Sequence, residues 1–335
     1  MQRKRIGVVM GGCSSEREVS LRSGEAVAQA LEEAGHDVIR LELGSGIDTC
    51  SMLSNARIDL AFLALHGRHG EDGCIQGLLE LLGIPYTGSD VLSSALAMDK
   101  LKAKELFRLH NVPTPPYYVF DGESLTADVV EAHGSFGYPV VVKPRREGSS
   151  VGVSVARNAT ELSHAAERAL EHDGSILVER FIAGREVAVG LLDGRVLGAV
   201  EIEPKKGIYD YESKYTPGMT HYHLPARLPA TRYRGVLNLA EQAVRALGAT
   251  GGARVDLIVT EGMNEYVLEV NTLPGMTATS LFPKIAAAAG YTFGALCEAL
   301  AEGARLHTAV PVCGYSRSHV QHVRTSEIQK LRMVG

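Results

Sequence analysis

Tryptophan is absent from this chain, and aromatic residues make up only 6% of its 335 residues. Cysteine is scarce as well, because only five occur, scattered along the chain and without a C-x-x-C pair. An odd number at irregular spacing argues against a disulfide framework and against a structural zinc site. The cysteine pattern therefore favours a reducing, cytoplasmic environment.

Long apolar runs are also missing. No stretch approaches the roughly 20 apolar residues that a membrane-spanning helix requires. The first residues are basic and then apolar, but the apolar run is too short for a signal peptide and no cleavage signature follows it. A formal net charge of −5 gives no reason to expect nucleic acid as the main partner. We therefore expect a cytoplasmic protein that binds neither membrane nor nucleic acid.

Two common nucleotide-binding signatures do not occur where glycines cluster. The Gly11-Gly12 turn is not part of a G-x-G-x-x-G sequence, and the Gly/Ser segment at residues 146–155 is not a G-x-x-x-x-G-K-[ST] loop opening a helix. What is present is an ordinary globular composition, 45% hydrophobic and 22% charged. A chain of this length predicts two or three domains with an ample core.

The first 90 residues alternate strand and helix patterns. Apolar runs typical of strands lie at residues 5–10, 36–43 and 60–65. Between the first two, Ser15 and Glu18 form an S-x-x-E capping box, which predicts a helix that ends near Gly35. Such alternation predicts an open parallel sheet.

Ligands of parallel sheets bind at the carboxyl ends of the strands, and two polar clusters fall there, at residues 11–18 and 66–73. Each cluster also has an ordinary interpretation. Glu16 in the first turn of a helix stabilises the helix dipole, and His66 resembles any hydrogen-bonded structural histidine.

The middle of the chain contains groups suited to anions. A helix predicted from about residue 93 to 110 carries three lysines, for which a solvated face is the usual interpretation: Lys100, Lys102 and Lys104. A strand ends at Lys143, which either reaches water or holds phosphate as a point charge. In the following segment, REGSSVGVSV, the glycines allow backbone N–H groups to approach an anion and the serines add donors. A hairpin closing over phosphates is the functional interpretation, and an ordinary turn is the alternative.

Regular patterns stop at residues 204–224, a stretch dense in tyrosine, lysine and histidine. It follows a hairpin centred on Asp193-Gly194, and a helix is predicted after it at residues 229–247. Structureless loops of this length are usually lids, binding loops or disordered segments. Helical patterns return from residue 283 to about residue 306.

The hairpin predicted at residues 254–271 concentrates polar groups. If it is centred on Gly262-Met263, Asp256 lies opposite Glu269 and Arg254 lies opposite Asn271. Strand alternation would place Val267 on the face of Glu269, and Leu268 on the other. Two close carboxylates repel unless a cation lies between them, and oxygen ligands suit Mg²⁺ bound to nucleotide phosphates. An exposed polar hairpin face is the alternative.

Nine segments, in order, resemble the D-alanine–D-alanine ligases of the ATP-grasp superfamily over about residues 5–305. They are GGCSSEREVSLRSG, LHGRHGEDG, IPYTG, ALAMDKLKAK, VVVKPRREGSSVGVS, LVERFIAGREV, YDYESKY, ARVDL and LEVNTLPGMTATSL. The resemblance implies an α/β and α+β fold, with a Rossmann-like N-terminal lobe followed by a two-lobed ATP-grasp fold. The domains it implies are residues 1–96, 97–182 and 183–307, with a lid at 204–224, whereas residues 308–335 match nothing and receive no function.

The resemblance also implies the reaction. ATP would phosphorylate the carboxylate of one D-alanine, and the amine of a second would attack the acylphosphate to give D-alanyl-D-alanine for peptidoglycan. A ligase that joins a different amino or hydroxy acid, and a non-catalytic ATP-binding module, are the alternatives. The family commonly forms homodimers, so a homodimer is expected.

The residue roles implied by the resemblance fall into four groups. The catalytic residues are Glu16, Ser149, Tyr215, Arg254 and Gly275. The ATP-binding residues are Lys100, Lys143, Glu179, Arg180, Phe181, Ile182, Glu186 and Lys214. The D-alanine-binding residues are Glu16, His66, Ser280 and Leu281. The ligands of two Mg²⁺ ions, for which Mn²⁺ is an accepted substitute, are Asp256, Glu269 and Asn271.

Overall fold

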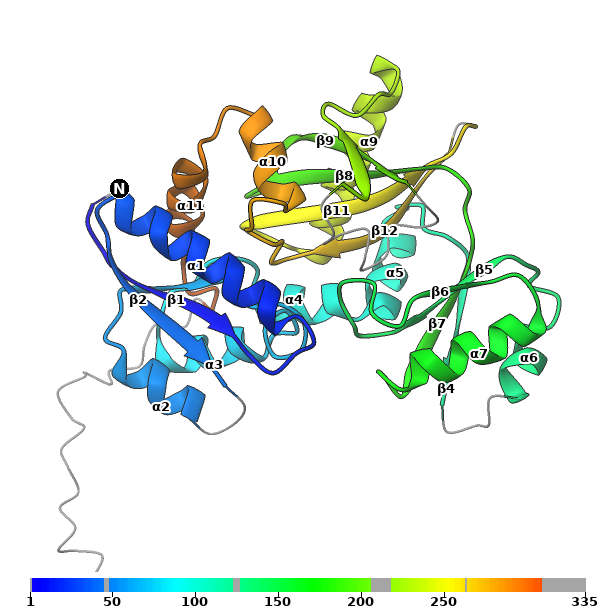
Figure 1. Ribbon diagram of the computed structural model, residues 1–335, viewed down its shortest axis with the longest axis horizontal. Helices are drawn as coiled ribbons and strands as arrows, with labels where there is room; N and C mark the ends of the chain where they lie inside the picture. Colours follow the sequence, from blue (N-terminus) through cyan, green and yellow to red (C-terminus); the bar gives the residue numbers. More distant parts are fainter. Residues whose placement is uncertain (1, 45–47, 123–126, 206–217, 263, 309–335) are drawn as a thin grey trace, which may run out of the picture.

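The computed structural model describes residues 2–44, 48–122, 127–205, 218–262 and 264–308. Three sheets occupy separate parts of the molecule, with the N-terminal sheet in blue, the four-stranded sheet in green and the five-stranded sheet in yellow-green to yellow (Figure 1). No helix in these ranges is both long and apolar enough to cross a membrane.

The N-terminal sheet is parallel, in the order β2-β1-β3, which confirms the expected open sheet. Its strands are β1 (Arg5–Gly11), β2 (Asp37–Leu43) and β3 (Leu60–Leu63). The helices between and after them are α1 (Arg17–Glu33), α2 (Asp48–Asn55) and α3 (Cys74–Leu82). Because β1 is buried on both sides of the sheet, its apolar run is nearly continuous.

The predicted capping box is wrong. Helix α1 begins at Arg17 with Glu16 at its N-cap, and no side chain caps its first turn. The hydroxyl of Ser14, not Ser15, fixes the preceding loop by donating to the carbonyl oxygen of His66 at 2.7 Å. The helix start is therefore positioned by a contact between the two polar clusters.

The single helix predicted over residues 93–110 is two helices, α4 (Val91–Met98) and α5 (Lys100–Leu109). They are separated by Asp99, whose backbone is extended. Its carboxylate accepts from the amide of Lys102 at 3.2 Å and from the guanidinium of Arg145 at 2.6 and 2.7 Å. This residue caps α5 and fastens it to the next sheet, so tertiary contact breaks the helical pattern.

The four-stranded sheet is antiparallel, in the order β4-β7-β5-β6. Its strands are β4 (Tyr117–Asp121), β5 (Val140–Pro144), β6 (Ser154–Ala156) and β7 (Ser175–Arg180), and its helices are α6 (Ala127–His133) and α7 (Ala159–Leu170). Val140 pairs with Ala156, so the Gly/Ser segment does connect two paired strands as predicted.

The five-stranded sheet is antiparallel, in the order β10-β9-β8-β11-β12. Its strands are β8 (Arg185–Leu192), β9 (Arg195–Pro204), β10 (Thr220–His223), β11 (Gly252–Val259) and β12 (Glu265–Asn271), and α9 (Ala230–Leu247) packs on one face. The prediction of a structureless stretch over residues 204–224 is wrong at its end, because Thr220 pairs with Pro204. Residues 206–217 of that stretch lie outside the described ranges.

The hairpin of β11 and β12 has the predicted register at its polar residues. Asp256 pairs with Glu269 and Arg254 pairs with Asn271. The register then shifts by one residue, because Leu257 pairs with Val267 and leaves Leu268 without a partner. Such a bulge reverses the faces beyond it. The predicted faces of Val267 and Leu268 are therefore wrong, and Val267 is fully buried in the core against α9.

The last helical stretch is also divided, into α10 (Leu281–Ala288) and α11 (Phe293–Glu302). Gly290, with φ of +97°, lies between them. Apolar side chains of both helices, among them Phe282 and Leu296, pack with Ile6 and Val8 of β1. Figure 1 shows α11 beside α1, so the C-terminal part of the chain returns to the N-terminal sheet.

Candidate active site

Two hollows meet between the three sheets. The first, of about 80 Å³, lies among the N-terminal loops, the end of β12 and the start of α10. The second, of about 140 Å³, lies between the four-stranded and five-stranded sheets. Glu269 lines both, so a ligand in one would reach a ligand in the other.

Glu16 provides the buried charge of the first hollow. The hydroxyl of Ser149 donates a hydrogen bond to Oε1 of Glu16. The second oxygen, Oε2, is buried and has no hydrogen-bond partner among the described residues. Because an unsatisfied buried carboxylate oxygen is costly, this atom suits a cationic N–H donor supplied by a ligand.

The loop that carries Ser149 is strained and closely fitted. Ser149 and Ser150 have φ of +46° and +59°, a conformation that costs non-glycine residues roughly 1–2 kcal/mol each. At Gly148, an added Cβ would lie 2.4 Å from Oε2 of Glu16. The glycine is therefore needed for close approach, and strain of this kind is typical of functional loops.

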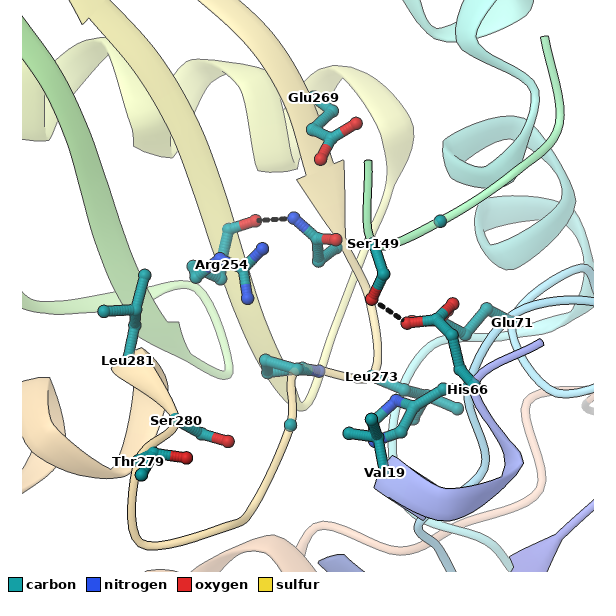
Figure 2. Close-up of a pocket in the computed structure, with 15 residues that line it drawn as sticks. Val19, His66, Glu71, Ser149, Arg254, Glu269, Leu273, Thr279, Ser280 and Leu281 are labelled. Atoms are coloured by element: carbon teal, nitrogen blue, oxygen red, sulfur yellow. Dashed lines mark hydrogen bonds between the residues drawn. The ribbon is translucent and has the colours of Figure 1, made fainter. Parts of the chain in front are cut away.

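His66 lies on the wall of the same hollow (Figure 2). Its Nε2 is 3.4 Å from the hydroxyl of Ser23, which also accepts from the amide of Met276 at 3.2 Å. Burial lowers the pKa of His66, so the imidazole is neutral near pH 7. It is thus both a structural link and a wall of the hollow.

Glu71 lines the hollow too, and the sequence did not single it out. Burial, together with the nearby charge of Glu16, raises the pKa of Glu71 to about 8. Its Oε2 accepts from the amide of Gly67 at 2.7 Å. The segment HGRHGEDG marked a polar cluster, but only the folded loop determines which of its two acids faces inward.

The start of α10 forms the far wall. Ser280 is the N-cap residue, and its hydroxyl accepts from the amide of Thr277 at 3.1 Å. An added Cβ at Gly275 would lie 2.8 Å from that hydroxyl, so the two residues are in close contact. A helix N-terminus with small neighbours suits a carboxylate. Leu281 completes this wall.

The β11–β12 hairpin brings Arg254, Asp256 and Asn271 into direct contact. The guanidinium of Arg254 donates to both oxygens of Asp256 at 2.8 Å. The amide of Asn271 lies 3.2 Å from Oδ2 of Asp256. Half a turn of that amide about its last single bond would present its oxygen to the same point.

The donor set fits a hard divalent cation. Asp256 and Glu269 are directly opposite each other, and Asn271 adds a third oxygen at the same end of the hairpin. Carboxylate and amide oxygens are the ligands that Mg²⁺ accepts. In the described ranges no three histidine, cysteine, aspartate or glutamate side chains come together in a metal-binding arrangement, so the third oxygen of this donor set is that of the Asn271 amide. A cation here would share Asp256 with Arg254.

The second hollow has apolar walls and a charged end. Its apolar residues include Val141, Val151, Val153, Ile258 and Leu268. The charged groups are Lys100, Lys143, Glu147, Glu179, Arg180, Glu186, Asp256 and Glu269. Apolar walls suit a flat base, and the ammonium groups of Lys100 and Lys143 suit phosphates. Leu268 faces this hollow only because of the bulge, which no local signal in the sequence indicated.

The lysines of α5 do not share a solvated face, so that interpretation is wrong. Lys102 is about half exposed, whereas Lys100 and Lys104 are buried. Burial lowers the pKa of Lys100, whose ammonium donates to the carbonyl oxygen of Glu147. Lys100 and Lys104 point instead toward the second hollow and its floor.

Glu179 lies between two lysines. Its side chain forms ion pairs with Lys104 at 2.7 Å and with Lys143 at 2.6 Å. Burial by itself would raise the pKa of Glu179, but the charges of both lysines lower it. The next residue, Arg180, is exposed and donates to the carbonyl oxygen of Phe136 at 2.7 Å.

Every predicted site residue in the described ranges lines one of the two hollows. The first contains Glu16, His66, Ser149, Arg254, Glu269, Asn271, Gly275, Ser280 and Leu281. The second contains Lys100, Lys143, Glu179, Arg180, Phe181, Ile182, Glu186 and Asp256. Lys214 and Tyr215 lie outside the described ranges. Tertiary structure brings these residues together in two hollows, but the role of each residue stays a prediction.

Comparison with known proteins identifies the relatives of this arrangement. Family models described as the D-ala D-ala ligase N-terminus and C-terminus match residues 47–89 and 106–302. The D-alanine–D-alanine ligase of Geotalea uraniireducens is 52% identical, covering 91% of this chain and 97% of that protein. That of Geobacter sulfurreducens is 54% identical over 84% of this chain and 88% of that protein.

Solved structures agree. The crystal structure of the Bacillus anthracis D-alanine–D-alanine ligase aligns with a TM-score of 0.79 and 38% identity, covering 89% of this chain and 96% of that one. A D-Ala:D-Ser ligase from Enterococcus faecalis aligns at 0.77 and 34% identity, covering 90% and 99%. These matches confirm the expected ATP-grasp fold. By sequence and by fold, this chain belongs to the D-alanine–D-alanine ligase family.

Proposed function

We propose that this chain is an ATP-dependent ligase that joins two molecules of D-alanine into D-alanyl-D-alanine, a peptidoglycan precursor. Curated relatives with this name, about 50% identical over most of the chain, support the activity. One relative of known structure was crystallised with ATP. The observation that carries the proposal is that Glu269 borders both hollows, so an amino acid in one would meet nucleotide phosphates in the other.

The first step activates a carboxylate, because a free carboxylate is a poor electrophile with a poor leaving group. The ammonium of the first D-alanine pairs with the buried Oε2 of Glu16, which has no hydrogen-bond partner among the described residues. This pairing points the substrate carboxylate toward the second hollow. Lys100 and Lys143, which line that hollow, hold the phosphates, and transfer of the terminal phosphoryl group gives an acylphosphate and ADP.

Asp256, Glu269 and Asn271 are the residues that would hold Mg²⁺. When bound, the metal supplies neutralisation of charge on the phosphates. The number of ions, for which we propose two, and the acceptance of Mn²⁺ follow from the family resemblance.

The second step forms the peptide bond. The carboxylate of the second D-alanine binds at the start of α10, beside Ser280 and Leu281. Its amine, once deprotonated, attacks the acylphosphate carbonyl. Arg254 and the backbone N–H of Gly275 stabilise the oxyanion of the tetrahedral adduct, which then expels phosphate. Tyr215, in the proposed lid at 204–224, would exclude water by joining the Glu16–Ser149 pair.

The domain division at residues 1–96, 97–182 and 183–307 is also a proposal. Its support is that each of the three sheets lies within one of these segments. A homodimer is proposed from the resemblance alone, and a cytoplasmic location from the cysteine pattern. Sedimentation of the purified protein would test the dimer.

A substrate panel tests the function. Purified protein with ATP, Mg²⁺ and D-alanine should release phosphate and form the dipeptide, detected by mass spectrometry. Asp256→Asn should reduce turnover by on the order of 100-fold, whereas Glu265→Gln, an acid on the same hairpin paired with Arg232, should not. Turnover only when D-serine or D-lactate is the second substrate would instead support the ligase of a different amino or hydroxy acid. ATP binding without any product would support the non-catalytic module.

A further inference from the structure

Lys104 is a fully buried charge that the proposed mechanism does not use. It lies on α5, and its ammonium is 2.7 Å from Oε1 of Glu179 and 2.6 Å from the hydroxyl of Thr114. The other oxygen of Glu179, Oε2, is 2.6 Å from the ammonium of Lys143. One carboxylate is thus held by two lysines, of which only Lys143 lines the second hollow.

The same contacts join three elements. Glu179 belongs to β7, and Lys104 belongs to α5. Thr114 passes the connection onward, because its hydroxyl donates to the carbonyl oxygen of Val267 on β12 at 2.9 Å. These contacts therefore fix the floor of the second hollow to both sheets that enclose it.

The charges decide what Lys104 contributes. A single lysine beside Glu179 would form a neutral pair, and Lys143 would then present little net charge to a phosphate. With Lys104 present, the three side chains carry a net charge of +1, and the surplus is on the lysine that faces the hollow. Burial lowers the pKa of Lys104 to about 8, while the charge of Glu179 opposes that shift.

We propose that Lys104 is a positioning residue for nucleotide phosphates: it neutralises Glu179 and thereby leaves the ammonium of Lys143 available to the anion. This inference rests on the proposed function, in that the ligand of the second hollow is taken to be a nucleotide. A purely structural ion pair is the competing explanation. It would stabilise the fold without distinguishing a phosphate-bearing ligand from one without phosphate.

Binding of ADP with Mg²⁺ is compared with binding of adenosine, which has the same base and ribose but no phosphate. The Lys104→Met variant should bind ADP about 10-fold or more weakly, while its affinity for adenosine changes less than about 3-fold. Lys102→Met, an exposed lysine on the same helix, is the matched control and should change neither affinity. Calorimetry serves for ADP and NMR titration for adenosine.

A second variant keeps the test decisive if Lys104→Met does not fold. The double variant Lys104→Met with Glu179→Gln removes both buried charges, so that the three positions again carry a net charge of +1, now on Lys143 alone. The ratio of ADP affinity to adenosine affinity in the double variant should return to within about 3-fold of the wild-type ratio. In Glu179→Gln alone, the same ratio should equal or exceed the wild-type ratio. Equal loss of both affinities in Lys104→Met, or a double variant that still discriminates against ADP, would overturn the proposal. Failure of the wild-type protein to bind ADP would count against the proposed function instead.

Discussion

Gly148 sits where the strained serine loop meets the buried carboxylate of Glu16. Because an added Cβ would lie 2.4 Å from Oε2 of Glu16, any larger residue must displace either the loop or the carboxylate. The carboxylate is the proposed partner of the first substrate's ammonium. A change at this position therefore tests the role of Glu16 without removing its charge.

We predict that Gly148→Ala raises the KM for the first D-alanine by about 10-fold or more, the equivalent of roughly 1.4 kcal/mol. The KM for ATP should change little. Steady-state kinetics with each substrate varied would measure both constants. Gly174→Ala, at a position with open space around the added methyl group, is the control. An unchanged KM for D-alanine would show that the fit between the loop and Glu16 does not matter for binding.

The raised pKa of Glu71 makes the free energy of unfolding depend on pH. Its folded pKa, raised to about 8 by burial and by Glu16, exceeds the unfolded value of about 4.5. Between these values the unfolded chain releases a proton that the folded chain retains, so folding is disfavoured progressively as pH rises from about 4.5 to 8. In Glu71→Gln the side chain has no carboxyl group, so this pH-dependent contribution to the free energy of unfolding is lost.

The melting temperature of Glu71→Gln should therefore increase relative to the wild type as pH rises through that window, in the absence of ligands. Differential scanning calorimetry of both proteins across the range measures the difference. A constant difference in melting temperature at all pH values would mean that the pKa of Glu71 is not raised in the folded protein.

At the scale of elements, the β12 bulge decides which of two neighbouring residues, Val267 or Leu268, faces the second hollow. Val267 packs in the core with Val255 and Leu257, whereas Leu268 lines the second hollow. Two adjacent apolar residues should therefore respond differently to truncation. Without the bulge, strand alternation would exchange their roles.

Leu268→Ala should raise the KM for ATP several-fold and leave the free energy of unfolding nearly unchanged. Val267→Ala should instead lower the free energy of unfolding by about 2 kcal/mol through loss of core burial, with little effect on the KM for ATP. Denaturant titration and initial-rate kinetics on both variants make the comparison. The reverse pattern would indicate that the bulge is absent in solution.

At the scale of the whole molecule, the C-terminal part of the chain closes the N-terminal sheet. Glu80 on α3 accepts from the amide of His307 at 2.8 Å and from the hydroxyl of Tyr86 at 3.0 Å, and it also contacts Thr308. The backbones of Tyr86 and Arg305 pair in an isolated antiparallel β-bridge. Hydrogen bonds to Glu80 hold its carboxyl ionised, since burial alone would raise its pKa but these donors lower it.

A chain ending at residue 308 should keep both its activity and its melting temperature. A chain ending at residue 304 should be less stable by about 1–3 kcal/mol, because Glu80 and Tyr86 lose their partners. Thermal denaturation and the ligase assay compare the two. Loss of activity in the chain that ends at residue 308 would assign a function to residues 309–335, for which the sequence suggests none.

The sequence by itself determined the alternation of the first lobe, the pairing of Asp256 with Glu269, and the family, because each depends on local periodicity or on contiguous motifs. It did not determine that α4 and α5 separate at Asp99, which requires Arg145 from another sheet. Only the tertiary structure decided that Leu268 lines the second hollow and that Lys104 lies buried beneath it. Burial of a charge and the offset of a bulge are set by partners distant in the chain, such as Glu179 beside Lys104, and so leave no local pattern.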